Sequence, residues 1–218
     1  MTISYANKLA ATGSTWTGST GTVTTSTFAS TTGNYYLLMI AGATVTGTPT
    51  MTGTTFALLV SSGTNFVYGG YCTSGTTAAV SFTWSGSNPT IAQCCDEVSG
   101  LTAASPVLQK KMTAGTTSSL SSLIQASNST YSINFLSLSS FGTVTPPTSY
   151  TTVATKGGAA GGIGFQSAAV VPGVAAAAWT DAGGAASNFV ATFEIGDPLA
   201  SFGTAPAVNS MMLMGMGV

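Results

Sequence analysis

Hydrophobic residues along this chain fall into short runs and alternating stretches that are typical of β-strands. Residues 35–41 read YYLLMIA between two glycine-containing turns, the pattern of a strand that is buried on both faces. Residues 44–52 read TVTGTPTMT, so every second residue is threonine and one face of this segment is threonine alone. Neither stretch has the spacing of an amphipathic helix.

Eight further segments have the same strand character, and turn residues separate them. About ten short strands without helical periods between them predict an all-β fold, an antiparallel β-sandwich of jelly-roll-like type. We expect two packed sheets around one core, with a short helix or an irregular excursion possible only at 106–125 and a second short candidate at 174–179. The further strands are expected at 55–60, 65–72, 77–84, 90–98, 131–138, 150–155, 162–169 and 188–195.

The domain organisation follows from where these segments lie. Residues 1–33 are expected to form an N-terminal arm or edge strand, 34–200 the β-sandwich domain, and 201–218 an apolar, Met-rich tail that is not an independent domain. Such a tail would be adhesive if exposed, so it either completes this domain's own sheet or inserts into a partner. Candidate subunit contacts are Trp16, Phe28, Met211, Met212, Leu213, Met214 and Met216.

Composition then narrows the function. Only 9 of 218 residues are charged, while 66 are serine or threonine, and the formal net charge is −1. The chain contains no arginine and no histidine, which excludes histidine-based catalytic triads, histidine-ligated metals and arginine clamps. Four lysines cannot neutralise a phosphate backbone, so nucleic acid is not an expected partner. We expect a non-enzymatic protein without cofactors.

So few charges also bear on association. A surface with little charge repulsion favours contact between copies, and we therefore expect identical or related subunits to cover much of it. The alternative is a hydroxyl-rich monomer that tolerates its low charge. No apolar stretch has the length of a membrane span, and residues 1–33 lack the apolar core of a secretory signal, so neither membrane insertion nor export is expected. The three cysteines are expected to be free, packed thiols, with Cys94 and Cys95 on opposite faces of their strand.

Carboxylates are the remaining candidates for chemistry. Asp96 and Glu97 are adjacent on a predicted strand and so face opposite sides, which prevents them from acting as an acid–base pair. We expect one of them to face inward or to cap a turn. Glu194, Asp197 and Asp181 could in principle bind Ca²⁺, but their spacing favours a simple turn after the strand, and no metal is expected.

Two weaker readings concern the exposed surface. The threonine ladder at 44–52 could order water as ice-binding faces do, but this would require the ladder to repeat on neighbouring strands. The triplets at 22–24 and 143–145 are similar, yet their spacing along the chain is irregular. A sugar could stack on Trp16, Trp84 or Trp179, and Trp179 is the one whose surroundings most favour exposure.

Three segments carry a resemblance to a known class. They are the strand after Gly33-Asn34, the strand AQCCDEVSG at 92–100, and the late strand NFVATFE at 188–194. Their order resembles that of bacteriophage virion proteins with a jelly-roll sandwich, over about residues 30–195. The resemblance implies a protein of the virion, most simply an outer-capsid cement or decoration subunit, whose partners are identical subunits and a major capsid or other virion protein. A tail or fibre component, or a carbohydrate-binding sandwich, is the alternative.

Overall fold

The apolar segment 35–41 forms strand β4 (Tyr35–Ala41) at the centre of the molecule, and all seven of its residues are buried. The computed structural model describes residues 3–116, 119–121, 131–138, 144–146, 150–156, 164–170, 178–181 and 188–197. These residues form antiparallel β-structure with no helix, and so none that could cross a membrane. The predicted all-β, sandwich-like fold is confirmed.

Two large sheets and two small ones contain the described strands. In order across the larger sheet lie β1 (Ser4–Thr15), β10 (Thr90–Ser99), β4, β7 (Asn65–Cys72), β6 (Thr54–Ser62), β5 (Thr44–Met51), β9 (Ser81–Ser85) and β2 (Thr20–Thr24). The second sheet contains β11 (Val107–Gly115), β18 (Asn188–Ile195), β13 (Tyr131–Leu138), β16 (Gly164–Val170) and β15 (Thr151–Lys156). The small sheets are β12 (Ser119–Ser121), β17 (Ala178–Asp181) and β14 (Val144–Thr145), and β3 (Phe28–Ala29) with β8 (Thr77–Ala78).

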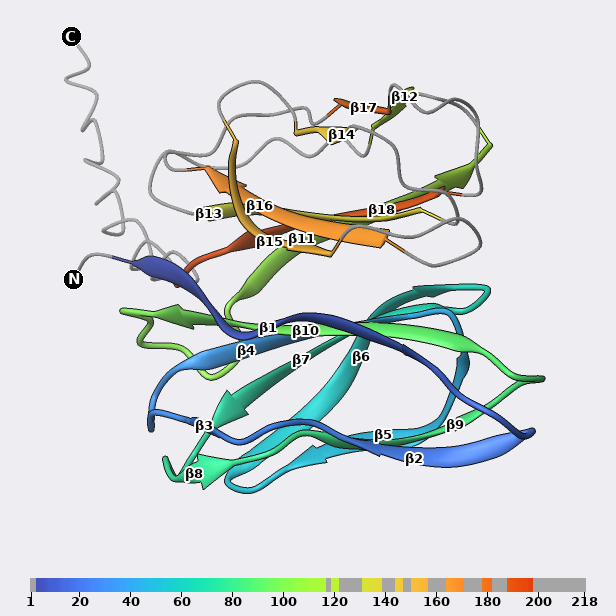
Figure 1. Cartoon of the computed structure of the whole chain (residues 1–218). Coiled ribbons are helices and arrows are strands. Elements are labelled where there is room, and N and C mark those ends of the chain that lie inside the picture. Colours follow the sequence, from blue (N-terminus) through green and yellow to red (C-terminus); the bar gives the residue numbers. More distant parts are fainter. Residues whose placement is uncertain are drawn as a thin grey trace, which may run out of the picture.

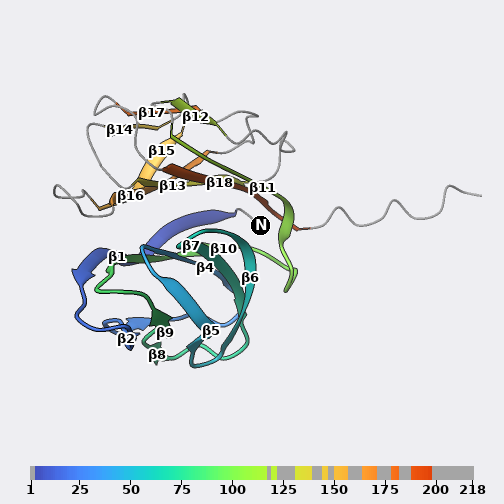
Figure 2. The ribbon, with the colours of Figure 1, turned by 90° about the vertical axis from the view of Figure 1, so that its right-hand side faces the viewer.

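The larger sheet curls, so its strands form two of the three main layers seen in Figures 1 and 2. We call β5, β9 and β2 the outer layer, and β10, β4 and β7 the middle layer. The second sheet packs on the other side of the middle layer. The middle layer is therefore covered on both faces, which is why β4 and β10 have almost no exposed positions.

Two hydrophobic cores result, one on each face of the middle layer. Alternate residues of β4 divide between them: Leu38 packs toward the outer layer, and Leu37 and Met39 pack toward the second sheet. The first core includes Val45, Phe82 and Trp84 of the outer layer, and the second includes Ile133, Phe189 and Phe193 of the second sheet.

Four expectations need correction. The single core is wrong, because the middle layer has a sheet on each side. The short helix or irregular excursion expected within 106–125 is wrong over 107–115, where β11 pairs with β18 as an edge strand. Val107 packs against the second core, and residues 109–112 are all exposed.

Eighteen strands are described rather than about ten. The segment before residue 34 contributes three, the segment 77–84 divides into β8 and β9, and β11, β12, β14 and β17 lie where no strand was expected. The helix candidate at 174–179 is wrong over 178–179, which begin β17, and its residues 174–177 lie outside the described part of the chain, as do tail residues 201–218.

Candidate functional site

The carboxylates of β10 are both buried, Asp96 with 0% and Glu97 with 7% of its surface exposed. They point to opposite faces of the strand, as predicted. The expectation that one of them faces inward is confirmed and holds for both, because β10 lies in the middle layer and both of its faces are covered. A carboxylate buried in this way requires hydrogen-bonding partners.

Strand β1 supplies those partners on both faces. The hydroxyl of Tyr5 donates to Asp96 Oδ2 at 2.5 Å, and Asn7 Nδ2 donates to Asp96 Oδ1 at 2.6 Å. On the other face Lys8 Nζ lies 2.8 Å from Glu97 Oε2. The two carboxylates therefore bind the edge strand β1 to the middle layer.

Glu97 has two more partners, from the side of the first core. Tyr36 donates its hydroxyl to Glu97 Oε1 at 2.6 Å, and Asn34 Nδ2 donates to the same oxygen at 2.8 Å. Burial alone would raise the pKa of Glu97, but hydrogen bonds from Asn34, Lys8 and Tyr36 and the charge of Lys8 outweigh it and hold the pKa below its ordinary value. Burial and the bond to Glu97 raise the pKa of Tyr36. The arrangement stabilises an ionised carboxylate and leaves no oxygen directed toward a substrate site.

Sequence reasoning identified both carboxylates but missed Tyr5, Asn7 and Lys8. These residues lie about 90 positions away along the chain, and only the antiparallel register of β1 with β10 brings them together. The signal was a polar cluster in an otherwise small-residue segment, YANK at 5–8.

The possible calcium ligands do not converge. Glu194 is buried and accepts a bond from Gln109 Nε2 at 2.8 Å. Asp197 accepts the backbone N–H groups of Thr102 at 2.6 Å and Ala103 at 2.9 Å. Desolvation would raise the pKa of Asp197, but these N–H groups lower it below the ordinary value. Among the described residues, no group of three His, Cys, Asp or Glu side chains lies close enough together to bind a metal ion. Asp197 instead stabilises a turn through its bonds to the backbone of residues 102 and 103.

The cysteine prediction is confirmed. Cys72, Cys94 and Cys95 are free and buried, and Cys94 and Cys95 enter different cores. Desolvation, together with the nearby charge of Asp96, raises the pKa of both Cys94 and Cys95 well above the ordinary value. Such thiols are poor nucleophiles, because the thiolate is the reactive form.

The exposed side of the outer layer is a continuous array of hydroxyl side chains, which we call the hydroxyl face. Its three strands are in register, so hydroxyl residues lie side by side in rows. The inner side of the same strands is apolar and belongs to the first core. The rows are Thr20–Ser85–Thr44, Thr22–Thr83–Thr46 and Thr24–Ser81–Thr50.

Hydrogen bonds connect the hydroxyl face across its strands. Thr46 Oγ1 donates to Thr83 Oγ1 at 2.9 Å, and the hydroxyls of Thr24 and Ser81 lie 3.2 Å apart. The ladder at 44–52 thus has companions on two neighbouring strands, which its sequence spacing had concealed. The register nevertheless shifts between Thr46 and Thr50, so the array lacks the constant period that ice binding would need.

The aromatic candidates are largely buried. Trp84 and Trp179 are each 1% exposed, so neither offers an indole face for a sugar, and the expectation for Trp179 is wrong. Trp16 and Phe28 are half-buried against the first core, where their rings lie 6.2 Å from Trp84 and 6.0 Å from Tyr36. Only part of each could contact a neighbour. The methionines of the tail lie outside the described residues.

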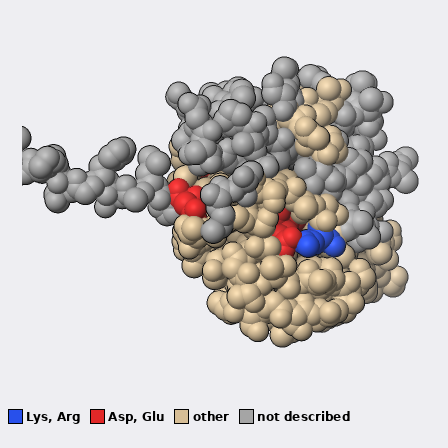
Figure 3. Space-filling model, turned by 90° about the vertical axis from the view of Figure 1, so that its left-hand side faces the viewer, with Lys and Arg blue, Asp and Glu red and all other residues tan. Residues whose placement is uncertain are grey.

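Some of the few charged side chains are buried, so the surface carries even fewer charges than the sequence contains. Residues 3–99 contain only Lys8, Asp96 and Glu97 as charged residues, and these gather at one place with both carboxylates buried. On the face shown in Figure 3, charged side chains occupy two small spots, and the rest of the described surface is uncharged. The body built from β1 to β10 therefore presents an almost uncharged exterior, on which Lys8 is partly exposed and paired with Glu97.

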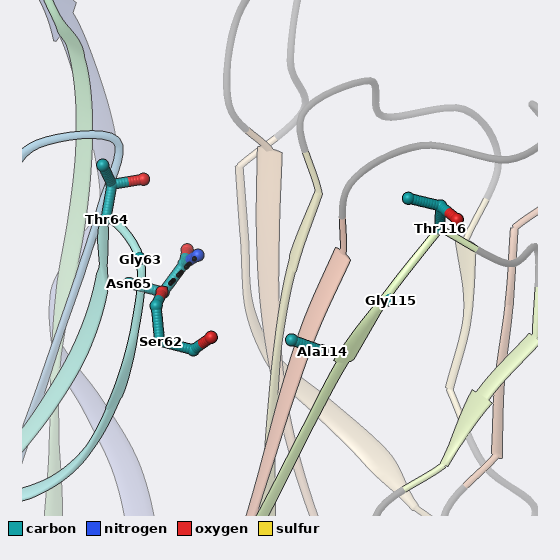
Figure 4. A pocket seen from close by; sticks show the side chains of 7 residues that line it. All are labelled: Ser62, Gly63, Thr64, Asn65, Ala114, Gly115 and Thr116. Atoms are coloured by element: carbon teal, nitrogen blue, oxygen red, sulfur yellow. Dashed lines mark hydrogen bonds between the residues drawn. The ribbon is translucent and has the colours of Figure 1, made fainter.

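One cleft, of about 510 Å³, lies between the turn that joins β6 to β7 and the end of β11 (Figure 4). Residues 62–65 form one wall and residues 114–116 the other, and all seven are small and uncharged. Asn65 Nδ2 donates to the backbone oxygen of Ser62 at 3.3 Å and so is already engaged. These walls supply neither a nucleophile with a base nor a charged anchor.

Comparisons with known proteins add no relative to this picture. No protein-family model, no curated protein and no solved structure matches the chain.

Proposed function

We propose that this chain is a non-enzymatic structural subunit of a larger particle, and that the particle is a bacteriophage virion in which it acts as an outer-capsid cement or decoration protein. The single observation that carries the proposal is the almost uncharged exterior of residues 3–99. A surface with so few charges can be covered by protein while desolvating almost no ions, each of which would otherwise cost several kcal/mol.

The buried carboxylates support the same proposal. Three of the five acidic residues, Asp96, Glu97 and Glu194, are engaged inside the fold, so they do not repel a neighbouring subunit. The resemblance of residues 30–195 to jelly-roll virion proteins names the class of particle. A tail or fibre position in the same virion is the second possibility, and it differs only in which virion protein is the partner.

Co-sedimentation tests the proposal. A lysate of the source cells during virus production is separated on a density gradient, and each fraction is quantified by mass spectrometry. We expect this chain to follow one shell protein at a constant molar ratio through the particle band and through a second purification. A chain that remains with free proteins at the top of the gradient, or whose ratio to every particle protein varies, would overturn the proposal.

A further inference from the structure

The edges of the two large sheets differ in a way that points to a partner. An edge strand exposes a row of unpaired N–H and C=O groups that can pair with a strand of another chain. Proteins prevent such pairing with charged side chains, above all lysine, and with bulges that break the register. The edge strands here are β1 and β2 in the larger sheet and β11 and β15 in the second sheet.

Three of the four edges carry both forms of protection. All four lysines of the chain lie on them: Lys8 in β1, Lys110 and Lys111 in β11, and Lys156 in β15. Each of these strands also has a register shift against its only neighbour in the sheet. A chain with so few cations thus has every one of them on an edge strand that is already bulged.

Strand β2 is the exception. Its sequence, TGTVT, contains no charge and no proline, and its register with β9 is continuous over all five residues. Among the described residues no strand pairs with its outer side. Five residues is an ordinary strand length, so β2 is not protected by being short.

The register shows which backbone groups β2 offers. Gly86 N–H donates to the oxygen of Ser19, and Thr25 N–H donates to the oxygen of Val80, both at 2.9 Å. Odd-numbered residues of this segment therefore bond to β9, because the pattern alternates along an antiparallel pair. The N–H and C=O groups of Thr20, Thr22 and Thr24 point away from the sheet.

We propose that β2 pairs with β2 of a second copy of this chain, antiparallel and about a two-fold axis at Thr22. Thr20 then lies opposite Thr24 of the second copy, and about six backbone hydrogen bonds form. The outer layers of the two copies join into one sheet whose hydroxyl face continues across the axis.

The occupant is a second copy because β2 is complementary to itself. Threonine meets threonine on the outer side, and Gly21 meets Val23 on the inner side, so no bulky pair is forced together. Hydroxyl groups both donate and accept, so either alignment of neighbouring threonines can be satisfied. No charge on β2 or on the hydroxyl face opposes the approach of an identical surface. A two-fold pair also closes the assembly, since β2 is the one unprotected edge strand described in the two large sheets.

This inference goes beyond the proposed function, because the pairing does not depend on the kind of particle. A chain that dimerises through β2 but occurs in no particle would remove the virion proposal alone. A monomeric chain that follows a shell protein through the gradient would remove only the β2 pairing.

The first experiment measures the mass of the purified full chain by light scattering, with three variants. We expect a dimer for the native chain and monomers for Thr22→Pro and Thr22→Lys. Proline removes only an N–H that faces away from β9, so the melting temperature should change little. Thr46→Lys is the matched control: it adds the same charge to the same row of the hydroxyl face, two strands from the edge, and should remain a dimer. A monomeric native chain, or a dimer that survives both Thr22 substitutions, would overturn the proposal.

The second experiment locates the axis by cross-linking. Opposed residues in a hydrogen-bonded antiparallel pair have their Cα atoms about 5.5 Å apart, within disulfide range. Under oxidising conditions Thr22→Cys should give a covalent dimer on a non-reducing gel, while Thr46→Cys should not. The three native cysteines are buried and should stay unlinked. Equal cross-linking of the two variants would contradict a two-fold axis at Thr22.

Discussion

The outer and middle layers belong to one sheet, yet the pattern of buried and exposed side chains differs between them. In the outer layer, β5 alternates between exposed threonine and buried Val45, Pro49 or Met51, except at the exposed Gly47, where the register with β9 shifts. In the middle layer, β4 and β10 have no such alternation, because both faces are covered. A strand with one wet face can carry hydroxyls freely, whereas a strand between two cores must be apolar or supply each polar group with a partner. Four substitutions test this difference.

The largest effect is expected from Leu38→Ala in the middle layer. Leu38 is 0% exposed and packs in the first core between Tyr68 and Cys95 on the neighbouring strands. Its truncation should lower the free energy of unfolding by about 3 kcal/mol, through lost burial and the cavity that remains. Urea denaturation measures the change. If the free energy of unfolding fell by no more than it does for an exposed-site substitution, the middle layer would not be a packed core.

The next effect concerns Glu97 and should depend on pH. Because the pKa of Glu97 is held below its ordinary value of 4.5 in the folded chain, the folded state binds fewer protons than the unfolded state. Its contribution is fully present above about pH 4.5 and is lost as the pH falls through the folded pKa. Glu97→Gln should cost about 2 kcal/mol at pH 7, where charge-assisted bonds are lost, and less at low pH.

Urea denaturation of the native chain and of Glu97→Gln at pH 7 and pH 3 measures that difference. Thr46→Val is the control, since position 46 is exposed and carries no titratable group, and its cost should be the same at both pH values. A cost for Glu97→Gln that is equal at both pH values would contradict an ionised, buried Glu97.

A smaller effect is expected where the outer layer meets the first core. A Cβ added at Gly21 would lie 2.8 Å from Cζ2 of Trp84, whose indole is buried. Gly21→Ala should therefore displace this ring and lower the free energy of unfolding by about 1–2 kcal/mol. Near-ultraviolet circular dichroism should report the ring movement. Thr22→Ala, which is one residue away and faces water, should leave the spectrum unchanged.

The smallest effect is expected on the hydroxyl face itself. Thr46→Val removes an exposed hydroxyl and its bond to Thr83 but preserves the β-branched shape. The free energy of unfolding should change by less than about 0.5 kcal/mol, and thermal denaturation would detect a larger change. A cost comparable to that of Leu38→Ala would mean that the outer layer does not differ from the middle layer in the way described.

The outcome of the sequence analysis can be understood from particular segments. Residues 35–41 were predicted as a doubly buried strand because an unbroken apolar run has no other satisfactory place. Residues 44–52 were predicted as a half-exposed strand because alternation leaves one polar face. Segment 107–115 was misjudged because KK at 110–111 breaks its apolar pattern, and those lysines have their place on a sheet edge. The sequence could not pair Tyr5, Asn7 and Lys8 with β10, because the register between strands about 90 residues apart is not encoded in the local residue pattern.

By itself, the amino-acid sequence determined the strand class, the scarcity of charge and the absence of histidine and arginine chemistry, because these depend on residue type and local alternation. The tertiary structure alone decided which strands became neighbours. From that neighbourhood came the burial of both Asp96 and Glu97, the rows of the hydroxyl face, and the placing of every lysine on an edge. Strand pairing joins segments that are distant along the chain, so its consequences arise from register and layer order rather than from local pattern.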